Sequence, residues 1–294
     1  MLRPMFFRSH NNGASKEMIY KEFELKEEGS LPGAKLTVYI QELFNEISFE
    51  KRPLVLLCPG GGYSYTSNRE AEPMAMAFMA KGYSTAILRY SCYPSHYPTS
   101  LLELGRSMLI IREHAKEWHV DMDAIVLEGC SAGGHLAANF ACTWKDDFLA
   151  SKLLGSTDDQ DKEKLRPNGL ILCYPVITSG EFAHRDSFVR LLGDRYDELL
   201  DEVSLENKVN ENVPRTFMWH TYTDGSVPVE NSLLFAMALK RHNINTELHI
   251  FPEGCHGLAL ASNITISSPE AKELVPTAQP WIELATTWMK YYGL

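Results

Sequence analysis

The stretch that decides the fold is AIVLEGCSAGGHLA, residues 124–137. It begins with a β-branched apolar run, typical of a buried strand, and passes directly into a helical segment. Between the two lies Ser131, with Gly129 and Gly133 around it in the pattern Gly-x-Ser-x-Gly. A serine at a strand-to-helix turn is either a nucleophile or a helix N-cap. This stretch alone leaves both interpretations open.

The rest of the chain alternates apolar runs of strand length with longer segments of helical period. This alternation is typical of a mostly parallel sheet with helices on both faces. We expect strands at 36–40, 53–58, 83–90, 124–129, 170–177, 216–222 and 246–251. We expect helices at 70–82, 101–120, 134–144, 230–242 and 281–292.

Two segments interrupt the alternation. Residues 155–169 are dense in charge and predict a solvated loop. Residues 179–212 predict short helices lying over the carboxyl edge of the sheet, where open α/β sheets bind ligands. We expect residues 1–294 to form one domain, because α/β folds of this size have a single large core.

Composition and charge exclude several classes of protein. The chain is 45% hydrophobic and 22% charged, as in a folded globular protein. Its net charge of −10, with no basic stripe, disfavours nucleic acid and anionic membranes as partners. Residues 1–18 lack the apolar core of a secretory signal, and no run is apolar enough to span a membrane, so we expect a cytoplasmic protein.

The cysteines predict free buried thiols. They form no Cys-x-x-Cys pair and have no regular spacing, which disfavours both a disulfide framework and a zinc site. We predict that Cys130 and Cys255, although they adjoin candidate catalytic positions, are structural. The cysteines are Cys58, Cys92, Cys130, Cys142, Cys173 and Cys255.

A nucleophilic serine needs a base to take its proton and a carboxylate to orient that base. His256, in FPEGCHGL, and Asp224, in TYTDGSVP, each follow a separate expected strand. Singly, a loop histidine is usually structural, and an aspartate before a glycine is typical of a turn. Together, in the chain order Ser, Asp, His, they favour a triad of Ser131, Asp224 and His256. Glu230 and Glu253 remain alternatives for the acid.

A glycine-rich loop follows the expected strand 53–58. Backbone N–H groups that stabilise an oxyanion must not be crowded by side chains, and PGGGY, residues 59–63, meets this need. We predict that Gly61, Gly62 and Ala132 supply these N–H groups, with a flexible turn as the alternative for the glycines. A phosphate-binding loop is disfavoured because GGGYSYTSN lacks the Gly-Lys-Ser/Thr ending.

Five motifs together carry a resemblance. They are PGGGY (59–63), LRYS (88–91), GCSAGGHLA (129–137), WHTYTDGSVPVENS (219–232) and FPEGCHG (251–257). Through them the chain resembles the α/β-hydrolase superfamily over nearly its whole length. It is most similar to small bacterial esterases grouped with acetyl-xylan esterases and hormone-sensitive-lipase-like enzymes. Pro59 stands where the lipase-like group usually has histidine, which favours the sugar-acetyl-esterase side.

This resemblance implies an α/β-hydrolase fold: a mostly parallel central sheet of about eight strands, helices on both faces, and a small cap or none. It implies a carboxylic ester hydrolase that forms an acyl-enzyme and needs no metal or organic cofactor. The expected partner is a small-molecule ester with a short acyl group, acetyl above all, and a sugar or oligosaccharide is one candidate alcohol. A homo-oligomer is compatible with the sequence.

Aromatic and apolar residues on the expected carboxyl-edge loops are candidates for the pocket wall. Aromatic rings there could stack on the alcohol, or they could simply close the core. The candidates are Tyr63, Tyr65, Tyr93, Tyr97, Tyr174 and Val227.

Three other functions are weighed against the esterase. A peptidase of the prolyl-oligopeptidase type shares the fold and triad order but usually has a large extra domain, for which we expect no room in 294 residues. A non-catalytic binding protein would not need the three triad residues. Some relatives are labelled xylanases, but a glycosidase needs two opposed carboxylates, and the sequence proposes no such pair.

Overall fold

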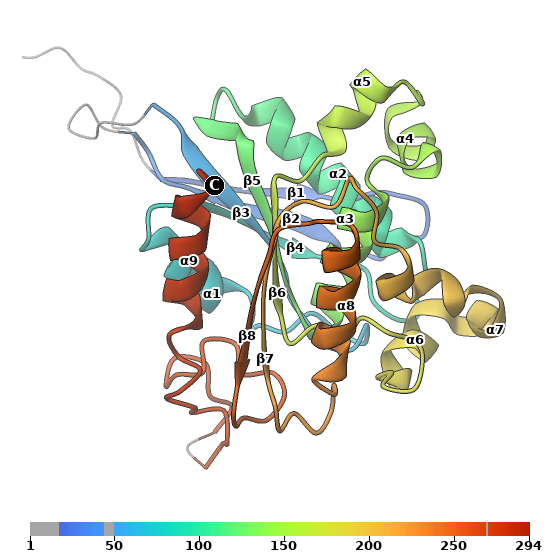
Figure 1. Cartoon of the computed structure of the whole chain (residues 1–294). Helices are drawn as coiled ribbons and strands as arrows, with labels where there is room; N and C mark the ends of the chain where they lie inside the picture. The colour runs from blue at the N-terminus through green and yellow to red at the C-terminus, as the bar shows by residue number, and fades with distance from the viewer. Residues whose placement is uncertain (1–17, 44–49, 269) are drawn as a thin grey trace, which may run out of the picture.

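The computed structural model describes residues 18–43, 50–268 and 270–294. Eight strands form one sheet in the order β1-β2-β4-β3-β5-β6-β7-β8 (Figure 1). β1 and β2 pair antiparallel, as do β2 and β4, and the remaining pairs are parallel. The strands are β1 (Ile19–Glu24), β2 (Lys35–Ile40), β3 (Arg52–Cys58), β4 (Ser84–Arg89), β5 (Val120–Cys130), β6 (Gly169–Cys173), β7 (Thr216–Thr221) and β8 (Thr246–Phe251).

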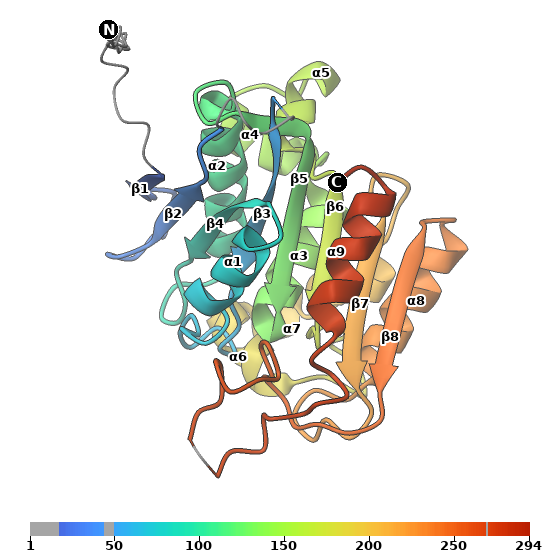
Figure 2. The ribbon, with the colours of Figure 1, turned by 90° about the vertical axis from the view of Figure 1, so that its left-hand side faces the viewer.

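Helices cover both faces of this sheet (Figures 1 and 2). α1 and α9 pack on one face, and α2, α3 and α8 pack on the other. The helices are α1 (Glu72–Met79), α2 (Thr99–His114), α3 (Ser131–Thr143), α4 (Asp147–Leu154), α5 (Asp159–Lys162), α6 (Arg185–Leu192), α7 (Tyr196–Leu199), α8 (Glu230–Arg241) and α9 (Trp281–Tyr291). The predicted α/β-hydrolase fold is confirmed.

The central strands are covered by helices on both faces, which explains the long apolar runs in their sequences. In β3, Leu54 and Leu56 enter the core under α2 and α3, whereas Val55 and Leu57 enter the core under α1 and α9. Successive side chains of a strand point to opposite faces, so a strand covered on both sides must be apolar at every position. Burial of these side chains contributes about 2 kcal/mol each to the stability of the fold.

Several predicted boundaries are wrong. The helix expected at 101–120 is α2, which ends at His114, and β5 already begins at Val120. The strand expected at 170–177 ends at Cys173, because Tyr174 has a φ of 38° and Pro175 has no N–H to donate to a ladder.

Other segments are more ordered than expected. The charged segment 155–169 contains α5 and the 3-10 helix Glu163–Leu165, and Leu165 is fully buried, so it is not simply a solvated loop. The edge strand β1 and helix α4 were not predicted. Residues 1–17, on which the expectation about a signal segment mostly rests, lie outside the described residues. Among the described helices, none combines the length and apolar character needed to cross a bilayer.

The segment 179–212 forms the predicted run of short helices. It contains α6, α7 and the 3-10 helices Gly193–Arg195, Asp201–Val203 and Leu205–Asn207. Figure 2 shows α6 beyond the arrowhead of β5, the end at which the candidate nucleophile lies. This placement brings α6 residues close to Ser131.

Candidate active site

The turn between β5 and α3 holds Ser131 in an unusual conformation. Ser131 has a φ of 53°, in the left-handed region that residues other than glycine rarely adopt. A Cβ at Gly129 would lie 2.4 Å from the carbonyl oxygen of Gly133, and one at Gly133 would lie 1.9 Å from that of Cys58. Only glycine fits at both positions, and the tight turn they allow presents Ser131 at the end of the strand.

The hydroxyl of Ser131 does not cap the helix. Cys130 is the N-cap residue of α3, and no side chain caps this end. Instead, Ser131 Oγ lies 2.7 Å from His256 Nε2. His256 Nδ1 lies 2.7 Å from Asp224 Oδ2. The structure therefore brings the three predicted residues into one hydrogen-bonded chain: Ser131 from the turn between β5 and α3, and Asp224 and His256 from the loops that follow β7 and β8.

The carboxylate of Asp224 is held by four groups. Oδ1 accepts the backbone N–H groups of Ser226 and Val227, both at 2.9 Å. Oδ2 lies 3.4 Å from His220 Nε2, in addition to its bond with His256. Burial by itself raises the pKa of Asp224, but the hydrogen bonds from His220 and His256 outweigh burial and hold that pKa well below its usual value. Asp224 is therefore ionised at neutral pH.

Neither alternative acid occupies this position. Among the described carboxylates, Asp224 is the one hydrogen-bonded to His256. Glu253 lines a separate groove with Cys255, and Glu230 lies in the first turn of α8.

The glycine loop adjoins the same cavity. Gly61 and Gly62 have φ values of 130° and 61°, and both line a cavity of about 420 Å³ together with Ser131 and His256. Ala132 lies in the first turn of α3, where backbone N–H groups have no helical partner. Within the described part of the chain, the N–H groups of Gly61, Gly62 and Ala132 donate to no other group. They are free to bind a ligand oxygen.

Of the six candidates for the pocket wall, Tyr65 is the one that lines this cavity, and three others are buried, as the alternative of closing the core predicts. Tyr65 lines the cavity and is 63% exposed. Tyr63, Tyr174 and Val227 are buried: the Tyr63 hydroxyl bonds to His135, the Tyr174 ring packs edge-on against His256, and the Val227 N–H binds Asp224. These side chains stabilise the interior instead of facing a ligand.

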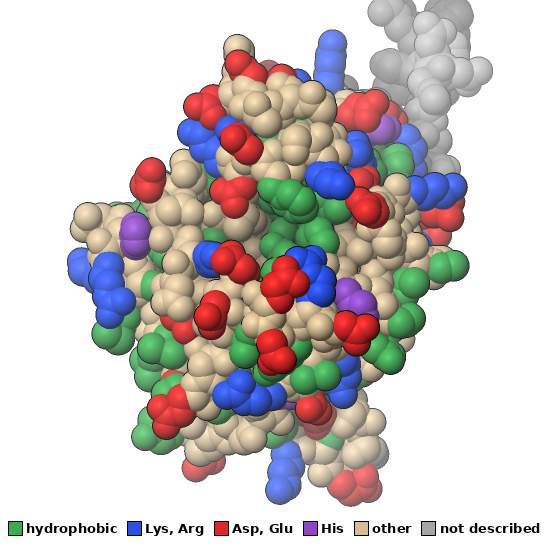
Figure 3. All heavy atoms as spheres, turned by 90° about the vertical axis from the view of Figure 1, so that its right-hand side faces the viewer, with side chains coloured by type: hydrophobic (Ala, Val, Ile, Leu, Met, Phe, Trp, Pro, Cys, Tyr) green, Lys and Arg blue, Asp and Glu red, His purple; other side chains and the backbone are tan. Residues whose placement is uncertain are grey.

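The remaining two candidates lie elsewhere on the surface. Tyr97 lines a different cavity, of about 680 Å³, with Leu102, Phe148 and Leu199. Figure 3 shows this hollow as a group of apolar side chains ringed by charged ones. Tyr93 is largely exposed, and its ring lies against His96.

Several residues that line the site cavity were not predicted from the sequence. His184, Asp186 and Arg190 reach it from α6 and the residue before it, and Arg69 and Glu70 reach it from the segment before α1. The predicted excursion over the carboxyl edge was the one signal that pointed to the α6 residues. These charged groups and the neighbouring serines and glycines make the cavity polar.

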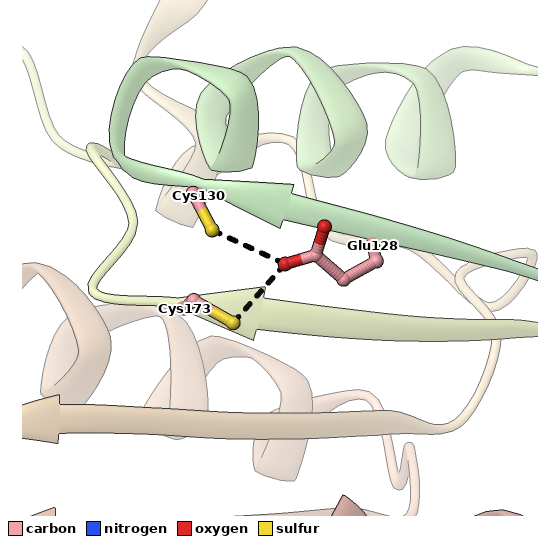
Figure 4. Close-up of side chains that lie close together, drawn as sticks. All are labelled: Glu128, Cys130 and Cys173. Carbon is pink, nitrogen blue, oxygen red and sulfur yellow. Dashed lines mark hydrogen bonds between the residues drawn. The ribbon is translucent and has the colours of Figure 1, made fainter. Parts of the chain in front are cut away.

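A buried polar cluster lies beside the candidate nucleophile. Glu128 Oε1 accepts hydrogen bonds from the thiols of Cys130 and Cys173, both at 3.2 Å (Figure 4). Burial raises the pKa of Glu128 to about 8 and the pKa of Cys173 to about 12. The carboxylate oxygen and the two sulfur atoms lie close enough together to ligate a metal ion. Metal ligands must be deprotonated, however, and at neutral pH these side chains are mainly protonated and uncharged.

The proton on Glu128 predicts a pH dependence of stability. The unfolded chain releases this proton near the ordinary pKa of 4.5, whereas the folded chain holds it until about pH 8. The folded state binds more protons over this interval, so the free energy of unfolding falls as the pH rises through it. Glu128→Gln, which has no proton to release, should become more stable relative to the wild type by a few kcal/mol between about pH 5 and pH 8.

Urea denaturation followed by tryptophan fluorescence at several pH values measures this difference. Glu211→Gln, at an exposed position, is the control and should follow the pH dependence of the wild type. Parallel pH curves for Glu128→Gln and the wild type would show that Glu128 does not retain a proton in the folded state.

Comparisons with known proteins agree with this architecture. Endo-1,4-beta-xylanase B of Butyrivibrio fibrisolvens is 35% identical over 84% of the chain, and the acetylxylan esterase of Xylanibacter ruminicola is 26% identical over 69%. The chain spans only 38% and 40% of the lengths of these two relatives.

A solved structure is similar over most of its length. The acetyl ester-xyloside bifunctional hydrolase of Caldicellulosiruptor lactoaceticus superposes with a TM-score of 0.75 at 37% identity, over 88% of each chain. Residues 43–239 match the BD-FAE family. This match covers more than half of the chain, including the glycine loop and the turn at Ser131. The chain therefore belongs to the BD-FAE family of α/β-hydrolases.

Proposed function

We propose that this protein is a serine carboxylic ester hydrolase acting on short-chain esters, acetyl esters of carbohydrates above all. The observation that carries the proposal is the continuous hydrogen-bonded chain from Ser131 through His256 to Asp224, with each of the two bonds at 2.7 Å. Nucleophile, base and orienting acid at these separations are the arrangement that acyl transfer requires.

The proposed mechanism assigns a proton movement to each step. His256 Nε2 takes the Ser131 proton as Oγ attacks the ester carbonyl, and the resulting imidazolium then protonates the leaving alcohol. Asp224 accepts the Nδ1–H of His256 and stabilises the imidazolium. Water, deprotonated by His256, releases the acid from the acyl-enzyme and restores the serine. The N–H groups of Gly61, Gly62 and Ala132 would bind the oxyanion in both halves of the reaction.

The polarity of the cavity supports a short acyl group. Its lining includes Ser64, Ser67 and Asp186, together with glycines. A long acyl chain would gain little from contact with such groups, because each methylene contributes about 0.8 kcal/mol only when it is buried against apolar surface. Two of the similar proteins, an acetylxylan esterase and an acetyl ester-xyloside bifunctional hydrolase, support acetyl as the acyl group and a sugar as the alcohol.

Hydrolysis of p-nitrophenyl acetate, butyrate and octanoate tests the acyl preference. We expect kcat/KM to fall as the chain lengthens, by at least about tenfold from acetate to octanoate, which corresponds to about 1.4 kcal/mol. Acetylated xylo-oligosaccharides would be the next substrates. Equal or rising kcat/KM with chain length would overturn the short-chain assignment.

The same preparation distinguishes the esterase from the peptidase and from the non-catalytic binding protein. Cleavage of an aminoacyl p-nitroanilide faster than of p-nitrophenyl acetate would favour the peptidase. Binding of an ester without turnover would favour the non-catalytic protein.

A further inference from the structure

A buried carboxylate, Glu70, lies between the glycine loop and the triad. Glu70 is 4% exposed and comes two residues before α1 begins. Its Oε2 accepts the backbone N–H of Gly60 at 2.8 Å, and its Oε1 accepts the hydroxyl of Tyr174 at 2.8 Å. Both carboxylate oxygens therefore bind groups from other segments, one after β3 and one after β6.

Gly60 is packed between this carboxylate and the candidate nucleophile. A Cβ at Gly60 would lie 2.8 Å from Glu70 Oε2 and also 2.8 Å from the Cβ of Ser131. The bond from Glu70 thus helps to set how closely the loop approaches Ser131. Gly61 and Gly62 follow directly, so a displacement of Gly60 would move the proposed oxyanion donors relative to the nucleophile.

Tyr174 extends the same contact to the loop that carries the base. Its hydroxyl oxygen accepts the N–H of Ala259 at 2.9 Å, and its ring lies edge-on to the ring of His256, with 5.2 Å between centroids. Burial raises the pKa of Tyr174 well above its usual value, so the hydroxyl keeps its proton and donates it to Glu70. One carboxylate is in this way connected to both the glycine loop and the loop of His256.

The neighbouring residue makes a parallel contact. Arg69 donates through Nη2 to the carbonyl oxygen of Gly257 at 2.9 Å. Two consecutive residues, Arg69 and Glu70, therefore bind the loop of His256 and the glycine loop.

We propose that Glu70 is a positioning residue that holds the glycine loop in place relative to Ser131 and His256. This inference rests on the proposed ester hydrolysis. Loss of one oxyanion donor lowers kcat by about 10²- to 10³-fold in other serine hydrolases, and a displacement of about 1 Å has an effect of about 10²-fold. Loss of the hydrogen bond from the Gly60 N–H to Glu70 should therefore lower kcat far more than it changes KM.

Glu70→Ala tests this role. We expect kcat for p-nitrophenyl acetate to fall by about 10²-fold with KM changed by less than about threefold. Glu70→Gln should recover most of the loss, because its amide oxygen can still accept the Gly60 N–H. Tyr174→Phe, which leaves the bond from Gly60 to Glu70 in place, should have a smaller effect on kcat than Glu70→Ala.

The chain offers a matched control in Glu103. Glu103 is fully buried, accepts the backbone N–H of Ser91 at 2.7 Å and accepts hydroxyl groups of Ser30 and Ser91, but it does not contact the glycine loop. Glu103→Ala should lower Tm while leaving kcat of the folded protein unchanged. An equal fall of kcat in Glu70→Ala and Glu103→Ala would reduce Glu70 to a structural residue and overturn the proposal.

Hydrogen exchange measured by mass spectrometry gives a readout independent of activity. Peptides covering residues 59–68 should exchange faster in Glu70→Ala than in the wild type or in Glu103→Ala. A wild type inactive on every ester would refute the proposed function, and exchange would still decide whether Glu70 holds the loop. Unchanged kcat, or unchanged exchange of the loop, in Glu70→Ala would overturn the positioning role.

Discussion

Replacement of Ser131 by alanine is expected to lower kcat for p-nitrophenyl acetate by about 10⁶-fold, to the level left by the remaining groups of the site. In the proposed mechanism Ser131 Oγ, which is hydrogen-bonded to His256 Nε2, forms the acyl-enzyme. Cys130 is the nearest nucleophile in sequence, but its side chain is fully buried and burial raises its thiol pKa well above the usual value. The measurement is steady-state hydrolysis with the purified variant.

This variant also has a stability control. Removing the Ser131 hydroxyl deletes the bond to His256, which lies in a partly exposed site, and should leave Tm within a few degrees of the wild type. A folded Ser131→Ala protein that retained more than about one hundredth of the wild-type kcat would show that Ser131 is not the nucleophile. Cys130→Ala should retain activity, and its loss in a folded protein would point to the thiol instead.

Asp224→Asn is expected to lower kcat by about 10⁴-fold. The carboxylate accepts the Nδ1–H of His256 at 2.7 Å, and this bond places the proton on Nδ1 and leaves Nε2 free to accept from Ser131. An amide whose N–H₂ group faces Nδ1 would favour the opposite tautomer, in which Nε2 carries the proton. His256 would then be unable to act as a base toward Ser131.

The two alternative acids supply matched controls. Glu230→Gln and Glu253→Gln should retain wild-type kcat, because within the described chain the carboxylate hydrogen-bonded to His256 is that of Asp224. Each variant is compared at the same folded fraction, determined by circular dichroism. Near-normal activity in Asp224→Asn, or a large loss in Glu253→Gln, would move the acid to a different residue.

The helices and strands could be predicted because the buried side chains follow two sequence patterns. Apolar residues recur at helical spacing in the helices and form short continuous runs in the central strands. Residues 54–58 of β3 and 124–127 of β5 are buried and continuously apolar, so the positions of these two stretches follow directly from the sequence. Boundaries were less predictable where a turn is set by tertiary contacts. At the start of β5, His119 adopts a φ of 52° and its carbonyl accepts the N–H of Arg52, a contact that no local pattern indicates.

The triad was predictable because each member follows a strand, and parallel strands end at one edge. The pocket wall was not, because a sequence does not tell which side of a loop faces the cavity. Tyr63 and Tyr174 have φ values of 56° and 38°, and both side chains turn into the interior. His220 and Glu70 were missed for a related reason. In a sequence, a histidine within a strand and a glutamate near the start of a helix are explained by ordinary structural roles. The groups that these two side chains contact become visible only in the structure.

Covalent labelling by a fluorophosphonate tests directly whether Ser131 is an activated nucleophile. The reagent requires a serine activated by its base, and it reports on the nucleophile without assuming any ester as the substrate. The proposed mechanism predicts one label per chain, located by mass spectrometry on the peptide containing Ser131. The label should be absent in Ser131→Ala and should form much more slowly in His256→Ala. No labelling of the folded wild type, or labelling at another residue, would contradict it.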